Sequence, residues 1–495
     1  MQTRSGLRVS LLAGHLCSPD PAAAASPLSR SGTDDIVRHG PPKLLTVAQL
    51  QSFIRDGYLA LSIVDDMGSE WVESLYAKCV EHGTGTTRDP ERPPLFATVS
   101  SEISELLACP TMTGALTSLL GGDYLLAAGE FANDGLKLHG SRRSEQGFHK
   151  DGTDHGPTQS TVRDHRPAHL IPMLYPMDTT IEMGPTSIIP GSNLLGVNRE
   201  GFFHSEDRIR AELAAPQTLE EWGQSMAAFP ENGSGAGDSE RLASAVGALR
   251  SSGLQEHKLE VKAGTVVFMH HDLVHRGTKA EDGAPFRAMI AIRNCVRVSD
   301  PVSPILPAGA EIEATWPEAW QGEPLAPAHM AIWRYLSGGA PQITLPRSAA
   351  GQSAAEEEAA AETTQASLEL IAKEEGESAA LGAAYRLAAL AAAGSEPAAE
   401  TLVAAATTSS DEGTRRAASQ ALTAAGASSD SDNEASTQHV LVRLLGLLEG
   451  GIAGLAVPSS PQLHIDRAAN VMVTVVHAIA QLTHWCENCT VVLVI

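Results

Sequence analysis

The stretches Gly147-Phe-His149-Lys-Asp151-Gly152 and Gly264-Thr-Val-Val-Phe-Met-His-His-Asp-Leu-Val-His275-Arg-Gly-Thr278 decide the fold that we expect. Side chains at positions i and i+2 of an extended strand point the same way, so His149 and Asp151 can bind one metal ion while Lys150 faces away. A third ligand must come from a separate strand, and residues 264–275 predict that strand, with His275 at its end. Two imidazoles and one carboxylate hold Fe(II) on one face and leave the opposite positions open to substrates.

Length and charge predict two or three domains that do not bind nucleic acid. The 495 residues exceed one ordinary domain, and 43% of them are hydrophobic, which is sufficient for a core. A formal charge of −24 argues against binding to a phosphate backbone, which needs clustered Lys and Arg. From residue 351 onward there are 18 acidic and 6 basic residues, so half of the negative charge lies in the last third. No stretch approaches the roughly 18 apolar residues of a membrane span.

Residues 1–40 are rich in Ala, Ser, Pro and Arg and are interpreted as a targeting or disordered leader. Within the leader, Arg8-Val9, five residues and then His15-Leu16 resemble a type 2 peroxisomal targeting signal. The alternative is a chance match within a mitochondrial or plastid leader, which would also be poor in acidic residues. The peroxisome is the compartment that we expect, with the cytoplasm or another organelle as the alternative.

Local signals predict the first elements of the globular part. Thr46 is the expected N-cap of a helix over 47–55, whose apolar face carries Leu50, Phe53 and Ile54. Asp56-Gly57 ends that helix, and residues 58–61 begin a strand. A second helix is expected over 69–82.

Between residues 125 and 298 the pattern is mostly one of short strands and turns, which is typical of an all-β sandwich or barrel. Pro190-Gly191-Ser192 predicts a tight turn after a strand at 186–189. Residues from about 198 to 257 are interpreted as an insertion, either a lid over the site or a surface excursion.

The C-terminal part has a different composition. Residues 346–378 form an Ala- and Glu-rich linker, and residues 379–484 contain the repeated runs Leu390-Ala-Ala-Ala-Gly394 and Leu422-Thr-Ala-Ala-Gly426. Their spacing of 32 residues predicts a short all-α solenoid resembling HEAT repeats, with an unstacked Ala-rich helix as the alternative. His484, Cys486 and Cys489 are too few for a complete zinc site, and residues 485–495 are expected to be a tail.

Five segments occur in the order of one known family: Gly-Phe-His149-Lys-Asp151-Gly, Glu182-Met-Gly-Pro-Thr-Ser-Ile-Ile-Pro190-Gly191-Ser192, Gly264-Thr-Val-Val-Phe, His275-Arg-Gly-Thr and Phe286-Arg287. By these segments, the chain from about 45 to 298 resembles the phytanoyl-CoA dioxygenase family. Asn193 departs from the pattern, because histidine often follows that turn, and the interval from Asp151 to His275 is long. Both departures concern the choice of substrate.

This resemblance implies an α+β domain over 41–345, built on a double-stranded β-helix, or cupin-like jelly roll, with flanking helices. It implies Fe(II), 2-oxoglutarate and O₂ as cofactor and co-substrates, with ascorbate as an optional addition. It also implies that His149, Asp151 and His275 are the metal ligands. A peroxisomal member of the family acts on a branched acyl-CoA.

The far carboxylate of 2-oxoglutarate needs a cation, and Arg287 is the preferred candidate. It lies 12 residues beyond His275 and is expected on the next strand, after the turn Glu281-Asp-Gly-Ala-Pro285. Its planar fork suits a carboxylate. Arg293 is the rival, because it is expected on the same side of the strand six residues on. Thr278 is expected to add a hydroxyl group to the same carboxylate.

Two alternative roles are expected for each of the other polar residues near these motifs. His270 and His271 are either partners of the metal ligands or packed strand residues, and His155, His165 and His169 either line the mouth or are solvated. The basic cluster Lys137, Arg142 and Arg143 either attracts an anionic substrate such as a CoA thioester or is ordinary charged surface.

We therefore expect an Fe(II)- and 2-oxoglutarate-dependent dioxygenase that hydroxylates a small organic or lipid-derived molecule, with an acyl-CoA as one candidate. Asp151 favours hydroxylation, because halogenating relatives have Gly or Ala there. One alternative is a catalytically degenerate jelly roll that binds a protein partner together with its helical repeats. A further alternative is an iron enzyme that does not use 2-oxoglutarate and has no need of Arg287.

Overall fold

The computed structural model describes the greater part of the middle of the chain. The described ranges are 40–82, 95–126, 136–142, 165–195, 254–293, 295–299, 305–309, 323–337, 377–392 and 395–408, with the single positions 145, 146, 148, 301, 320, 414, 417, 418, 421 and 422. The leader, most of the expected insertion, the linker over 346–376 and everything after 422 lie outside the described residues. Predictions for those segments stay predictions.

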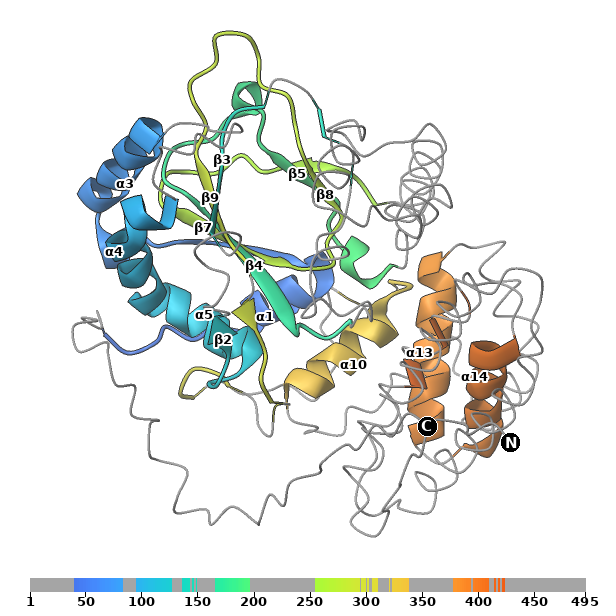
Figure 1. The fold of residues 1–495 in the computed structure, drawn as a ribbon. Helices are drawn as coiled ribbons and strands as arrows, with labels where there is room; N and C mark the ends of the chain where they lie inside the picture. The colour runs from blue at the N-terminus through green and yellow to red at the C-terminus, as the bar shows by residue number, and fades with distance from the viewer. Residues whose placement is uncertain are drawn as a thin grey trace, which may run out of the picture.

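Seven antiparallel strands form the large sheet at the centre of the molecule (Figure 1). Its main path runs in the order β1 (Tyr58–Ser62), β7 (Thr265–His270), β4 (His169–Tyr175), β10 (Cys295–Val296) and β2 (Leu125–Leu126). Off this path, β9 (Met289–Ile292) pairs with β4 and with β3 (Leu136–His139).

A smaller sheet of three antiparallel strands lies across from the large one (Figure 1). Its order is β6 (His257–Lys258), β5 (Thr186–Ile188) and β8 (His275–Gly277), so β5 is central. Ile188 lies opposite His257 on one side and opposite His275 on the other. β6 begins at the last residue of the range expected to be an insertion.

An apolar cluster joins the two sheets. Strand β7 alternates between two cores: Val266 and Phe268 face the helices, while Val267 and Met269 face the small sheet. The cluster between the sheets consists of Ile171, Met173, Tyr175, Ile188, Leu259, Val267, Met269, Leu273, Met289 and Ala291. Two antiparallel sheets with helices outside them fit the expected α+β jelly-roll core.

Residues 264–275 do not form one strand, and that expectation is wrong. β7 ends at His270, the amide of Leu273 donates to the carbonyl of His270 at 2.9 Å, and the chain resumes as β8 at His275. β7 belongs to the large sheet and β8 to the small one. The tight turn over 270–273 lets the chain cross between the sheets, which a purely apolar strand pattern does not indicate.

The first elements confirm the local predictions. α1 (Val47–Asp56) begins at the N-cap Thr46, whose hydroxyl accepts from the amide of Gln49, and buries the three expected apolar residues. It ends at Gly57, which has a φ of 76°. β1 follows directly, and α3 has the predicted bounds Ser69–His82.

The remaining N-terminal helices are α2 (Val64–Met67), α4 (Leu95–Ala108) and α5 (Pro110–Leu120). Helices α3, α4 and α5 follow one another along one side of the sheets (Figure 1). Apolar side chains of α1, α3, α4 and α5 join Val266 and Phe268 in the larger core. Among the described residues no single helix is long and apolar enough to cross a membrane. The bent pair Thr98–Ala108 and Pro110–Leu120 has the required length and apolar composition only when its two helices are taken together.

Helix α10 (Ala326–Leu336) connects this core to a C-terminal helix pair, α13 (Glu377–Ala392) and α14 (Glu396–Thr408) (Figure 1). A Cβ atom at Gly382 would overlap the carbonyl oxygen of Pro324, so α13 approaches the loop before α10 very closely. His165 Nδ1 lies 2.8 Å from the hydroxyl oxygen of Tyr385. One helix pair is therefore present and docked, while a stacked solenoid resembling HEAT repeats stays a prediction.

Candidate active site

Four of the six predicted site residues lie in the described part of the chain. His275, Thr278, Arg287 and Arg293 are described, whereas His149 and Asp151 lie outside the described residues. Among the residues that the structure describes, no group of three or more His, Cys, Asp or Glu side chains could hold a metal ion. The three-ligand iron site consequently stays a prediction, and the described residues test only its surroundings.

His275 opens strand β8 and is buried, with 8% of its surface exposed. Its Nδ1 atom lies 3.0 Å from the carbonyl oxygen of Leu273. A carbonyl accepts but cannot donate, so Nδ1 carries a proton, and Nε2 is the nitrogen that has the lone pair in the neutral form of the ring. Metal-binding histidines are commonly oriented in this way by a backbone carbonyl, so the donor chemistry of His275 fits a ferrous ion.

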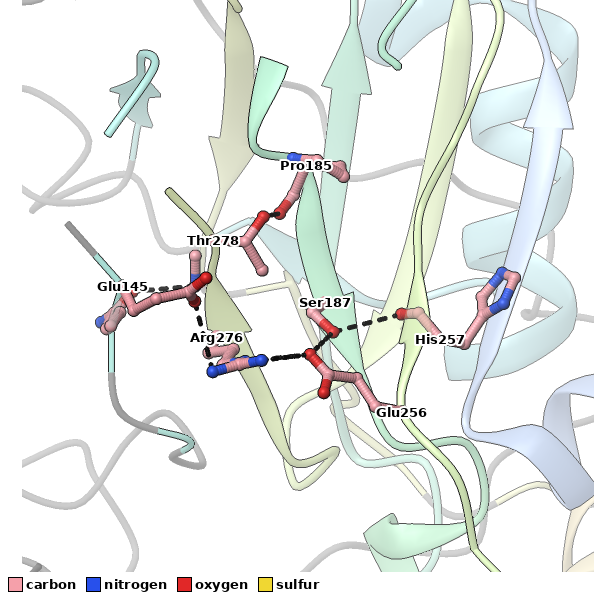
Figure 2. A network of polar contacts seen from close by, with 9 residues as sticks. Glu145, Pro185, Ser187, Glu256, His257, Arg276 and Thr278 are labelled. Atoms are coloured by element: carbon pink, nitrogen blue, oxygen red, sulfur yellow. Dashed lines mark hydrogen bonds and ion pairs between the residues drawn. The ribbon is translucent and has the colours of Figure 1, made fainter. Parts of the chain in front are cut away.

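Arg276, the next residue, connects strand β8 to the residues before β6 and to the residues before His149 (Figure 2). Its guanidinium contacts a Glu256 carboxylate oxygen at 2.5 Å and Glu145 at 3.2 Å. Its Cζ atom lies 4.4 Å from the centre of the Phe148 ring. The same Glu256 oxygen accepts from the Ser187 hydroxyl at 2.6 Å, so β5, β6 and β8 share one polar network with the residues that precede His149.

The segment before His149 also follows the backbone of β8. The amide of Gln146 donates to the carbonyl of Gly277 at 2.9 Å, and the side-chain oxygen of Gln146 accepts from the amide of Gly277 at 3.1 Å. Farther back, the amide of Ala280 donates to the carbonyl of Arg142 at 2.9 Å. Together these bonds place Arg142 and Gln146 alongside the strand that begins at His275.

Arg287 is among the largest fully buried side chains, with 1% of its surface exposed. Nη1 donates to the carbonyl of Gly184 at 2.6 Å and Nη2 to the carbonyl of Gly140 at 3.0 Å. Nε is buried without a hydrogen-bond partner, and no carboxylate of the described residues forms an ion pair with this guanidinium. A buried cation without a counter-ion is costly, so this position suits an anionic ligand.

The electrostatic surroundings of Arg287 are consistent with that assignment. Burial lowers the pKa of Arg287, as does the nearby Arg142, whereas Tyr175 opposes the shift. Tyr175 is fully buried, donates to the Thr186 hydroxyl at 3.1 Å, and has a pKa that burial raises. Bound anions favour the charged form of arginine, so a carboxylate here would counteract both effects.

Arg287 precedes β9 by two residues, rather than lying within the next strand as expected. Thr278 is buried, and its hydroxyl donates to the carbonyl of Pro185 at 2.6 Å. A carboxylate only accepts, so Thr278 can donate to it only after its hydroxyl rotates away from Pro185. Arg293 follows β9 directly and is partly exposed. The preference for Arg287 over Arg293 as the carboxylate-binding residue stays a prediction.

The other histidines that were considered near the site, where they are described, make hydrogen bonds or ring contacts. His270 Nδ1 accepts from the amide of Asp272 at 3.1 Å, and His271 stacks on His169 with ring centres 4.0 Å apart. His165 is buried against Tyr385 and is therefore not solvated, which was one of its two expected roles. His155 lies outside the described residues.

Sequence reasoning missed one feature of this region: Tyr175 lies in an apolar run, and nothing in its sequence context indicates its proximity to Arg287. Arg142 is expected either to attract an anionic substrate or to be ordinary charged surface, and its buried Nε, which has no partner, does not fit ordinary surface. Lys137 is exposed, as a surface cluster would require, and Arg143 lies outside the described residues.

No family model and no curated protein matches this chain. Several solved structures show similarity. One is a non-heme alpha-ketoglutarate-dependent carbocyclase, SnoK from nogalamycin biosynthesis, with 16% identity, a TM-score of 0.32, and coverage of 51% of this chain and 85% of that one. HygX from Streptomyces hygroscopicus, with nickel and 2-oxoglutarate bound, has 19% identity, a TM-score of 0.25, and coverage of 50% and 86%.

A third similar structure is AviO1 from Streptomyces viridochromogenes, with 15% identity, a TM-score of 0.28, and coverage of 53% of this chain and 99% of that one. These scores lie below the range that establishes a shared fold. The fold of this chain therefore follows from its own strand pairing, and its chemistry from its own side chains.

The described part of the site combines a buried cation with an oriented histidine ring. Arg287 supplies a buried cation, and His275 presents a ring nitrogen from the small sheet. Apolar residues of both sheets pack against one another in a buried cluster.

Proposed function

We propose that this protein is an Fe(II)- and 2-oxoglutarate-dependent oxygenase that hydroxylates a small organic or lipid-derived molecule. The observation that carries the proposal is the buried guanidinium of Arg287, which has an unpartnered Nε and no carboxylate partner among the described residues. A dicarboxylate co-substrate supplies the missing negative charge.

The proposed iron ligands are His149, Asp151 and His275. Two described contacts support this set. Phe148, the residue before His149, stacks under Arg276, the residue after His275, and Gln146 bonds to Gly277. Consecutive Cα atoms are about 3.8 Å apart, so contacts between the neighbours of two residues support a short distance between those residues. A short distance between His149 and His275 is what binding of one metal ion by both would require.

Each residue then has a defined task. His275 offers Nε2 to the metal because Leu273 orients its ring, and Arg287 holds the far carboxylate of 2-oxoglutarate. When bound, iron with O₂ supplies the oxidising chemistry, while the protein binds, orients and excludes water. The apolar cluster between the sheets excludes water from the site.

The finer assignments rest on sequence alone and are part of the proposal. A lipid-derived substrate such as an acyl-CoA, membership in the phytanoyl-CoA dioxygenase family and a peroxisomal location follow from the motifs quoted above. A protein partner bound by the C-terminal helices is proposed on the same basis.

The competing function is that of a catalytically degenerate jelly roll that acts as an interaction module. Such a module has no need of an oriented His275 or of an unpaired buried arginine, and both are present. An iron enzyme that does not use 2-oxoglutarate would likewise have no use for Arg287.

Anaerobic titration of the full chain with Fe(II) and then 2-oxoglutarate tests the proposal. The wild type should bind both, and should form succinate in air when a substrate from a panel of acyl-CoA and free-acid candidates is added. His149→Ala and Asp151→Ala should lose iron binding, whereas Arg287→Met should keep iron and bind 2-oxoglutarate at least about tenfold more weakly.

Lys262→Gln is the matched control, because it removes a positive charge from an exposed ion pair with Asp178 that is 2.8 Å long. It should bind both ligands as the wild type does. Undiminished iron binding and turnover in His149→Ala or Asp151→Ala would rule out the assigned site.

A further inference from the structure

Arg142 lies on the same face of strand β8 as His275. Alternate residues of a strand share a face, so the Cα positions of His275 and Gly277 present the same side of β8. A Cβ atom at Gly277 would overlap Cδ of Arg142. The side chain of Arg142 therefore crosses the open side of Gly277, two residues along the strand from the proposed metal ligand.

Arg142 also adjoins Arg287 through the backbone. Arg287 donates from Nη2 to the carbonyl of Gly140 and from its amide to the Ser141 hydroxyl, at 3.0 and 2.8 Å. Arg142 is the next residue, and its proximity lowers the pKa of Arg287. The segment over 140–142 thus brings two guanidinium groups to one region.

Neither guanidinium is neutralised within the described part of the chain. The Nε atoms of Arg142 and Arg287 are both buried without a hydrogen-bond partner, and no ion pair joins either side chain to a described carboxylate. Two like charges at close range repel each other, and one anion placed between them would relieve the repulsion.

We propose that Arg142 is a second binding residue for the terminal carboxylate of the 2-oxo acid co-substrate, acting beside Arg287. This inference rests on the function proposed above and adds to it: the site selects dicarboxylic over monocarboxylic 2-oxo acids by means of two cations. Gly277 is also required for this binding, because only glycine leaves room for the Arg142 side chain at this position.

Calorimetric titration of the Mn(II)-loaded full chain tests this proposal. In Arg142→Gln, 2-oxoglutarate should bind about tenfold more weakly, while 2-oxobutyrate, which lacks the second carboxylate, should bind within about twofold of the wild type. Arg142→Lys should recover part of the loss. Gly277→Ala should reproduce the loss although the charge remains, because the new methyl group displaces the side chain.

Binding of Mn(II) alone should be unchanged in Arg142→Gln and Gly277→Ala, and Lys262→Gln should bind all three ligands as the wild type does. If the wild type binds 2-oxoglutarate and Arg142→Gln binds it equally well, the role of Arg142 is wrong and the proposed function stands. An equal loss for 2-oxobutyrate would also overturn the role. If the wild type binds no 2-oxoglutarate, the proposed function itself fails.

Discussion

At the scale of single residues, Gly184 determines the position of the Arg287 guanidinium. The carbonyl of Gly184 accepts from Arg287 Nη1 at 2.6 Å, so the position of that backbone decides where the guanidinium lies. Gly184 has a φ of 65°, and an added Cβ would lie 2.5 Å from the carbonyl oxygen of Thr278. Both its conformation and its close approach require glycine.

Gly184→Ala should consequently destabilise the fold by more than about 2 kcal/mol, because the methyl group meets backbone atoms that cannot move aside. Gly283→Ala is the matched control, since Gly283 has a φ of 83° but nothing within 4 Å, and should cost about 1 kcal/mol. Urea unfolding of both variants gives the comparison. Equal losses would contradict the close approach at Gly184.

At the scale of elements, the small sheet is joined to the segment before His149 chiefly by Arg276. One guanidinium contacts Glu256 of the β6 end, Glu145 and the Phe148 ring. The network lies around strand β8 (Figure 2), so it can hold one group of proposed iron ligands against the other.

Arg276→Met should weaken Mn(II) binding about tenfold, because residues that orient metal ligands commonly have effects of that size. Arg276→Lys should recover little, since an ammonium group cannot bridge both carboxylates and stack on Phe148. Metal titration followed by electron paramagnetic resonance measures the affinity. Wild-type affinity in Arg276→Met would show that the network does not position the ligands.

A second element-scale feature is the contact of α10 with α1, where His329 is buried near Glu323 and Trp320. Burial lowers the pKa of His329 to about 4, and Arg55 adds to the decrease while Asp56 opposes it. In the unfolded chain the pKa is about 6.5, so the unfolded state binds this proton first as the pH falls.

The lowered pKa of His329 should therefore not reduce the free energy of unfolding above about pH 6.5. The free energy of unfolding should decrease progressively as the pH falls from 6.5 to 4, because the unfolded chain binds the proton and the folded chain does not. We expect the free energy of unfolding to fall by about 2 kcal/mol between pH 7 and pH 5 in the wild type. His329→Leu should be much less sensitive to pH over this interval. An identical pH dependence in both proteins would exclude His329 as the titrating group.

At the scale of the whole molecule, the first C-terminal helices are packed against the core of the two-sheet domain. Helix α13 and helix α14 belong to the same apolar core as α10 and the large sheet (Figure 1). Gly382 touches the loop at Pro324, and Tyr385 reaches His165. Any further repeats would then extend from a helix pair that is already docked.

Gly382→Ala should detach or loosen α13, since its Cβ would overlap the carbonyl oxygen of Pro324. We expect a loss of more than about 2 kcal/mol and faster proteolysis within α13. Ala383→Gly is the control in the same helix and should cost about 1 kcal/mol through helix propensity alone. If Gly382→Ala melts and is cleaved like the wild type, α13 is not docked in this way.

The sequence by itself determined the elements whose signals are local. The N-cap Thr46, the apolar spacing of α1, the stop at Gly57 and the start of β1 all depend on neighbours within a few residues, and each was predicted correctly. The short-strand pattern also indicated the all-β core, because strand periodicity is local. The motif at His149 and Asp151 is local too, and it remains a prediction.

Only the tertiary structure decided the features that depend on distant contacts. An apolar run cannot reveal that β7 and β8 belong to different sheets, because the crossing depends on which strands pair with each half. A basic cluster cannot reveal that Arg142 turns inward over Gly277 beside Arg287, since burial and missing counter-ions involve residues more than a hundred positions apart. Pairing and charge neutralisation are properties of the folded chain, and the proposed site depends on both.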